Sequence, residues 1–229
     1  MPLLSIVTVS VRPDRLDAYE DIVRRVVDRA ARIDDRARWH VQQVTFGEAG
    51  RLHFVQELSD WAELGRLERT DEVVLRMFGE DEGRPLLASL RACLLGSRRT
   101  VSRERPDLGT SAGDTVLPSA MSLVTILRVH PGGGPACETL IQRTAEAIGR
   151  VGDPTHLQVY ETLIGDGRSY WTVRPIEEIS ELGEVLPPRD LLLKAFGDEG
   201  LRIYRTGLEA VEHVDRQLTV LRPDLSRLD

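Results

Sequence analysis

Residues that would indicate a disulfide framework, a metal site or a membrane span are scarce in this sequence. Among 229 residues there are two cysteines, Cys93 and Cys137, and neither has a second cysteine or a histidine at the spacing of metal ligands. Two isolated thiols are typical of a reducing compartment, so we expect a cytoplasmic protein with no bound metal. No apolar run approaches the roughly 18 residues that a membrane-spanning helix requires, and the opening residues are typical of a strand rather than of a signal peptide.

The sequence also has no excess of basic residues, with 30 Lys and Arg against 37 Asp and Glu. The formal net charge is -7 and the pI is about 5.4. The basic residues that do cluster, at Arg98, Arg99, Arg103 and Arg105, are interrupted by Glu104 and indicate a solvated strand face. Because proteins that bind a duplex usually present a clustered basic surface, we expect no nucleic-acid partner and, without an apolar span, no membrane partner. Aromatic residues make up only 5% of the chain, so any interior must be packed mainly by aliphatic side chains.

What the sequence does contain is an internal repeat. The tetrapeptide RPDL occurs at 105–108 and again at 222–225. Further blocks recur in the same order: LSIVTVSVRP with SLVTILRVHP, HVQQV with HLQVY, GRLHFV with GRSYWT, AELG with SELG, and MFGEDEG with AFGDEG. The offsets stay between 116 and 118 residues (156 − 40 = 116 and 131 − 13 = 118). Six ordered blocks at a nearly constant offset indicate two copies of one unit.

Each copy is predicted to have the same order of elements. In the first copy, β-branched and apolar residues predict a strand over 3–11, three- and four-residue spacing predicts a helix over 16–33, and a hairpin is expected over 39–58. A helical region with a break at Gly79 follows, and a strand over 98–104 closes the unit. The order β-α-β-β-α-β is that of the ferredoxin-like arrangement, an α+β fold with helices on one face of an antiparallel sheet.

We therefore predict two ferredoxin-like units fused in tandem, at 1–108 and 121–229, joined by a linker at 109–120. The first strand of each unit is apolar on both faces although helices cover only one, so we expect the two sheets to face each other. The arrangement resembles the dimeric α+β-barrel superfamily, which includes antibiotic-biosynthesis-type monooxygenases and NIPSNAP-like proteins. This resemblance rests on the element order and on the strand-Val-x-Pro-helix opening. It implies a self-contained pseudo-dimer and leaves a further homo-oligomer open.

Strand alternation indicates which polar side chains would point between the two sheets. His40 and Gln42 share one strand face, as do His156, Gln158 and Tyr160 in the second copy. For the next strand the sequence leaves open whether the face of Tyr170 or that of Trp171 points inward. One interpretation makes His40 and His156 general bases, with a small-molecule ligand bound by five residues: Gln42, Gln158, Tyr160, Tyr170 and Arg128. The other interpretation is that these are polar residues at strand entries, hydrogen-bonded locally and half exposed.

Three functions are compatible with these residues. The first is a cofactor-independent enzyme of monooxygenase, isomerase or cyclase type that acts on a small apolar molecule between the sheets, since such chemistry requires only a shaped pocket and one or two polar groups. The second is a non-catalytic protein that binds a small ligand or a partner and has a filled interior. The third is a haem protein, because dye-decolourising peroxidases and chlorite dismutases also resemble tandem ferredoxin-like units. In that case His213, at a predicted helix end, would be the haem ligand. Otherwise we expect His213, like His53 and His130, to be solvated or to cap a helix.

Overall fold

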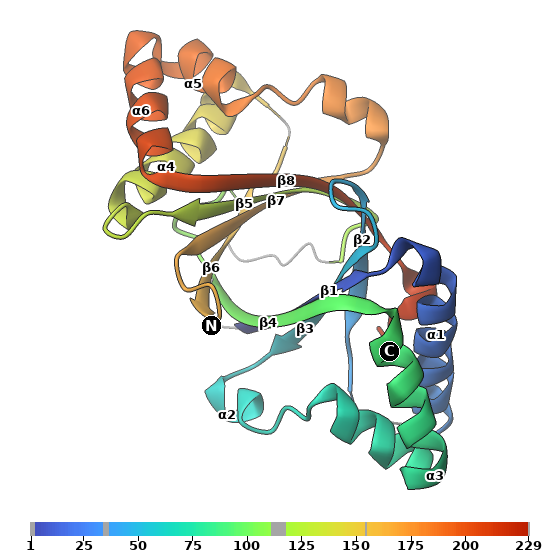
Figure 1. Cartoon of the computed structure of the whole chain (residues 1–229). Helices are drawn as coiled ribbons and strands as arrows, with labels where there is room; N and C mark the ends of the chain where they lie inside the picture. Colours follow the sequence, from blue (N-terminus) through green and yellow to red (C-terminus); the bar gives the residue numbers. More distant parts are fainter. Residues whose placement is uncertain (1–2, 34–36, 111–117, 154, 229) are drawn as a thin grey trace. The chain divides into compact units, whose positions relative to one another are not determined.

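The computed structural model of the chain describes residues 3–33, 37–110, 118–153 and 155–228 and shows a mixed α+β fold (Figure 1). The chain divides into two compact units. The first unit runs to Val101 and also includes the chain from Val220 onward, and the second is Ser102–Thr219. This division differs from the predicted boundaries at 108 and 121, for a reason that lies in the two RPDL segments.

The first unit combines a sheet with helices on one of its faces. Its elements are β1 (Leu3–Val11), α1 (Leu16–Arg32), β2 (His40–Phe46), β3 (Arg51–Leu58), α2 (Trp61–Leu64), α3 (Thr70–Cys93) and the greater part of β4 (Leu94–Glu104). Pro13 opens a single 3-10 turn after β1, because proline has a fixed φ and no N–H to continue the strand ladder. The break predicted in α3 is confirmed, since Gly79 has a φ of 73°, a conformation that favours glycine.

Strand registers fix which side chains share a face in this unit. β1 pairs antiparallel with β3 from Leu3 opposite Leu58 to Ser10 opposite Arg51, and β2 pairs with the other edge of β3. Successive side chains alternate between the two faces of a strand. On β1, Val7 and Val9 therefore face the helices, and Thr8, which lies between them, faces away. The helix-covered face of β1 therefore carries Val7, Val9 and Val11 together with Ser5.

The second unit has the same order of elements. They are β5 (Met121–Val129), α4 (Gly134–Val151), β6 (Gln158–Ile164), β7 (Ser169–Ile176), α5 (Pro188–Phe196), α6 (Asp198–Glu209) and most of β8 (Val211–Leu221). β5, β6 and β7 begin 118 residues after β1, β2 and β3 (121 − 3, 158 − 40 and 169 − 51). Within the first unit the strand order is β4-β1-β3-β2, and within the second it is β8-β5-β7-β6.

The second RPDL segment packs in the first unit, together with the strand that it borders. The backbone N–H of Arg222 donates to the carbonyl of Val41 (2.8 Å), and Arg227 and Trp39 exchange two backbone hydrogen bonds (2.8 and 3.0 Å). Leu225 is completely buried in the core of this unit. The C-terminal residues thus complete the first unit, although their sequence repeat predicts that they close the second.

The first RPDL segment does the same in the second unit. The N–H of Arg105 donates to the carbonyl of Val159 (2.7 Å), and that of Thr110 donates to Leu157 (2.9 Å). Leu108 lies in the core of this unit. The two closing segments are therefore exchanged between the halves of the sequence. Of the predicted linker, residues 111–117 lie outside the described part of the chain.

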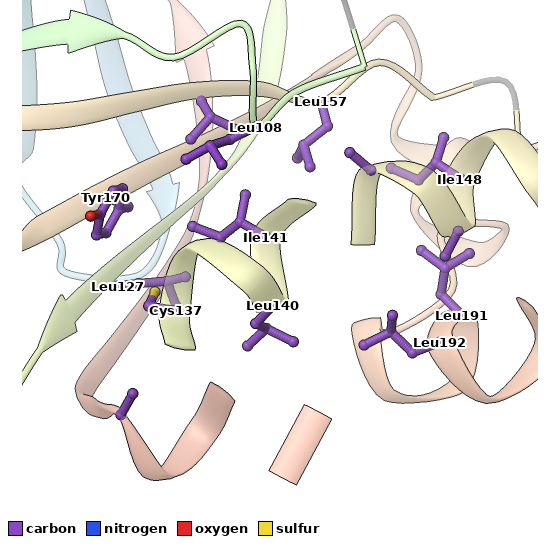
Figure 2. Close-up of a cluster of buried hydrophobic side chains, with 14 of the residues drawn as sticks. Leu108, Leu127, Cys137, Leu140, Ile141, Ile148, Leu157, Tyr170, Leu191 and Leu192 are labelled. Atoms are coloured by element: carbon purple, nitrogen blue, oxygen red, sulfur yellow. The ribbon is translucent and has the colours of Figure 1, made fainter. Parts of the chain in front are cut away.

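The core of the second unit is filled by close helix packing (Figure 2). Side chains of α4, among them Leu140 and Ile141, lie between strand residues such as Leu127 and the leucines of α5. α6 approaches α4 so closely that a Cβ added at Gly207 would lie 2.5 Å from the Cβ of Leu140. Only glycine fits this contact. The corresponding residue of α3, 117 positions earlier, is Leu90.

Candidate functional site

The first unit contains a cavity of about 1390 Å³ on the helix-covered face of its sheet. Its walls come from β1, β3 and β4, from α1 and α3, and from the segment 63–71 that joins α2 to α3. In Figure 1, α2 and α3 lie below β3 and β4. Small-molecule sites usually measure about 300–1,000 Å³, so this cavity can hold a molecule of several rings.

The sheet wall of the cavity is apolar with a polar end. Val7 lies opposite Phe54 in the register of β1 and β3, and both side chains line the cavity. The neighbouring pair on the same face is Ser5 opposite Gln56. Ser5 is buried, and among the described residues neither of these two side chains has a hydrogen-bond partner. An apolar ring system would therefore find two polar groups at one end of this wall.

Tyr19 is the most unusual polar group of the cavity. It lies on α1 and is 3% exposed, and its hydroxyl has no hydrogen-bond partner among the residues that the structure describes. Burial, followed by the nearby thiol of Cys93, raises the pKa of Tyr19, so the phenol stays protonated. Buried tyrosine hydroxyls usually find a partner, so a protonated donor left open in an apolar cavity points to a ligand oxygen.

Arginines predominate at the exposed side of the cavity. The charged residues lining it are five arginines and three carboxylates: Arg66, Arg69, Arg76, Arg91 and Arg99, with Glu63, Glu68 and Asp71. Two of the carboxylates are paired, Glu68 with Arg76 (2.7 Å) and Asp71 with Arg69 (3.3 Å). Arg99, on β4, is exposed and has neither a hydrogen bond nor an ion pair within the described residues. We call the exposed edge carrying these residues the arginine mouth.

Two of the residues predicted as a site in the first half, His40 and Gln42, lie on the sheet face away from this cavity. Both are buried, opposite Val55 and His53 respectively. Desolvation by burial lowers the pKa of His40 to about 4, so its imidazole is neutral near pH 7. His53 was expected to be solvated or to cap a helix, and this is wrong, because it is buried and its Nδ1 lies 2.9 Å from the hydroxyl of Thr8.

In the second unit the predicted residues are divided between faces. His156 is exposed and precedes β6. Gln158 and Tyr160 are buried and share one face with Trp171, and neither amide atom of Gln158 has a hydrogen-bond partner among the described residues. Tyr170 lies on the other face.

Two further predicted residues are held by ion pairs or hydrogen bonds. The hydroxyl of Tyr170 donates to Glu138 of α4 (2.7 Å), which makes Tyr170 part of the helix packing. Arg128 is half buried and pairs with Asp166 (2.7 Å). The structure therefore groups Gln158 with Tyr160, and separates both of them from Tyr170.

The two His-x-Gln segments of the sequence, at 40–42 and 156–158, do not occupy equivalent positions in the strands. The registers place His40 opposite Val55 and Gln158 opposite Val173, and these pairs are 118 residues apart (158 − 40 and 173 − 55). His40 therefore corresponds to Gln158 rather than to His156. Matching the two histidines uses an offset of 116, which is two residues short of the offset that the strands follow.

The residues present do not fit a haem site of the predicted kind. His213 lies in β8, not at a helix end, and it is exposed, as are His130 and His156. A proximal haem ligand must be held by surrounding structure. Within the described residues there is also no group of three or more His, Cys, Asp or Glu side chains that could hold a metal ion. No described helix is long and apolar enough to cross a membrane.

The cavity and its polar groups are not evident from the sequence. In the sequence, Tyr19 falls within the three- and four-residue spacing that predicts the helix over 16–33, which is equally the pattern of a core position. A hydroxyl on an otherwise aliphatic helix stripe is the one signal that could have indicated a site. Ser5 and Gln56 give no such signal, because their pairing depends on the register of two strands.

Comparison with known proteins supports the fold. No protein-family model matches this chain, and no curated protein matches it. Among solved structures, an "anthrone oxidase-like protein" has a TM-score of 0.61 at 14% identity, covering 96% of this chain and 91% of that one. A "putative monooxygenase" of Lactobacillus acidophilus has a TM-score of 0.51 at 7% identity, covering 96% and 93%. Chlorite dismutase of Candidatus Nitrospira defluvii has a TM-score of 0.55 at 10% identity, covering 97% and 92%. The chain therefore has the fold of the dimeric α+β-barrel superfamily.

Proposed function

We propose that the chain is a monooxygenase-type enzyme that oxidises a small apolar molecule with dioxygen, without a bound cofactor, in the cavity of the first unit. The observation that carries this proposal is Tyr19, a buried residue lining an apolar cavity, whose hydroxyl is a protonated donor with no hydrogen-bond partner among the described residues. The likeness to an anthrone oxidase-like protein and to a putative monooxygenase supports the reaction class. The site differs from the one predicted between the sheets, because the cavity lies on the helix-covered face.

An anthrone-type substrate illustrates what the residues would do. Its CH2 group loses a proton to solvent, and the ring carbonyl oxygen becomes an enolate oxygen. Dioxygen then oxidises the carbon to a carbonyl, so that CH2 and O2 give C=O and H2O. A hydrogen bond from Tyr19 to the enolate oxygen stabilises the charge that develops in this step, and the apolar walls strengthen it by excluding water. Ser5 and Gln56 also line the cavity and would provide further polar contacts to the molecule.

The test is oxygen consumption with anthrone as the probe, in the presence of EDTA and without added flavin. We expect dioxygen uptake, together with formation of the quinone in equal amounts. Removing a single donor to a developing oxyanion commonly lowers kcat by about 10²–10³-fold, and we expect a loss of this order for Tyr19→Phe. Tyr204→Phe is the matched control, since Tyr204 is a partly buried tyrosine in the core of the second unit, and it should retain full activity.

Two results would contradict the proposal. Anthrone that binds in the cavity without any dioxygen uptake would assign the chain to the non-catalytic ligand-binding proteins. Equal turnover by the wild type and by Tyr19→Phe would remove Tyr19 from the reaction.

We also propose that the chain is a tandem pair of ferredoxin-like units, at 1–108 and 121–229 in the sequence. The repeated strand orders β4-β1-β3-β2 and β8-β5-β7-β6 and the constant offset of 118 residues support it. Ligand binding at His40 and Gln42 in the first unit, and at Gln158, Tyr160 and Arg128 in the second, remains a prediction. The unpartnered amide of Gln158 supports ligand binding there, whereas a pKa of about 4 makes His40 a weak base.

A further inference from the structure

We infer that the substrate of the cavity carries an anionic group, held at the arginine mouth by Arg99, while its apolar body lies against Val7 and Phe54. The inference rests on the proposed function for the location of the site. It adds the chemical class of the ligand, an amphipathic organic anion with a carbonyl or phenol oxygen in its apolar part.

The first support is the local reversal of charge. The chain as a whole has a net charge of -7, yet the arginine mouth has five arginines and three carboxylates, a difference of +2. An overall negative protein repels an anionic ligand, and a local positive edge beside an apolar cavity offsets that repulsion where the ligand enters. A cavity for purely neutral molecules would not need this edge.

The second support is that Arg99 forms no ion pair or hydrogen bond within the described residues. The arginines at positions 69 and 76 are paired with carboxylates of the mouth, whereas Arg99 has no partner within the described chain. A guanidinium binds a carboxylate through two parallel hydrogen bonds, so a free arginine at a cavity edge suits this group well. The hydroxyl of Tyr19, a buried residue that lines the cavity, supplies the separate polar contact.

The two contacts can be tested separately with two tricyclic quinones of nearly equal shape. Anthraquinone-2-carboxylate has a ring carbonyl for Tyr19 and a charge for Arg99, and anthraquinone-2-carboxamide has the carbonyl without the charge. Calorimetric titration of the full chain should show tighter binding of the carboxylate, by about two- to fivefold in low salt, since exposed ion pairs are of this strength. The preference should shrink as salt is added.

Variants then assign the contacts. Arg99→Gln should abolish the preference for the carboxylate and leave carboxamide binding unchanged. Arg98→Gln is the matched control, because Arg98 is exposed and adjacent on β4 but does not line the cavity, and it should retain the preference. Tyr19→Phe should weaken both probes by a similar factor.

The inference is overturned if the two quinones bind equally, or if Arg98→Gln and Arg99→Gln reduce the preference to the same extent. These outcomes are distinct from a failure of the proposed function. Neither quinone is oxidised further at a CH2 group, so the titrations report binding whether or not the chain turns over anthrone.

Discussion

Replacing Arg222 by methionine tests whether the exchanged C-terminal segment holds the first unit together. The Arg222 guanidinium binds both carboxylate oxygens of Glu20 (2.7 Å each), and also contacts Gln43 (2.5 Å) and Asp224 (2.8 Å). Glu20 lies on α1 and is 8% exposed, so this contact connects the closing segment to the helix through a shielded carboxylate. Methionine keeps the apolar stem of the side chain and removes only the charged end.

The magnitude follows from which of these contacts is shielded. Asp224 has a side-chain exposure of 42%, and exposed ion pairs contribute only about 0–1 kcal/mol. The bidentate contact to Glu20 is the stronger one, but Arg24 also binds Glu20 (2.8 Å) and keeps part of its charge balanced. Breaking a fully buried pair costs about 3–5 kcal/mol, so with this remaining partner we expect a loss of about 2–3 kcal/mol.

Urea unfolding followed by tryptophan fluorescence measures this loss, since the indole N–H of Trp39 donates to the carbonyl of Leu225 (2.9 Å) and so reports on the closing segment. Hydrogen exchange adds a local measurement, because the amides around Val41 and Arg227 should exchange faster while those around Val159 stay protected. Arg24→Met is the control and should cost less than about 1 kcal/mol, since Arg24 is more exposed. A loss below about 0.5 kcal/mol for Arg222→Met, or faster exchange in both units alike, would refute the reasoning.

Two further predictions concern packing and pH. Gly207→Ala should destabilise the protein by about 1–3 kcal/mol in urea unfolding, because the new Cβ would overlap Leu140. Gly149→Ala is the control on α4 and should stabilise the protein by about 0.5–1 kcal/mol, because its new Cβ would meet open space. Equal effects of the two substitutions would contradict the packing described. The pKa of His40 is lowered from 6.5 to about 4 by burial, so the unfolded chain binds its proton first as the pH falls, and stability should decrease between pH 6.5 and pH 4. His40→Gln should flatten that part of the stability curve relative to His156→Gln, and identical curves would show that His40 is not the group responsible.

The order of the elements could be read from the sequence because it depends on local patterns. The strand over 3–11 and the break at Gly79 follow from side-chain type and from the backbone freedom of glycine. The start of β4 could not be read in the same way. β4 begins at Leu94, directly after α3 ends at Cys93, with no turn residue to mark the change, and so the strand was predicted from residue 98.

Contacts between distant segments could not be predicted from the sequence. His40 and His156 look equivalent in the repeat, but strand register decides that His40 corresponds to Gln158, and register is set by a partner strand. The exchange of the RPDL segments has the same origin. The repeat shows that Arg105 and Arg222 are similar positions, but either half of the chain could have supplied the acceptor at Val41 or Val159. Tyr19 was missed because a helix stripe shows which side faces the sheet and not whether the space there is filled.

The two units differ in how closely a helix packs at equivalent positions on the helix-covered side of the sheet. In the second unit Gly207 brings α6 into contact with Leu140, and Tyr170 is bound to Glu138, so the polar group on the helix side already has a protein partner. In the first unit the position of Gly207 is taken by Leu90, which lines the cavity, and the hydroxyl of Tyr19 has no described partner. A leucine in place of glycine separates helices that would otherwise touch. The close packing of the second unit stabilises the fold. In the first unit the open cavity and the unpartnered donor lower the free energy of unfolding, and a ligand bound there would restore part of it.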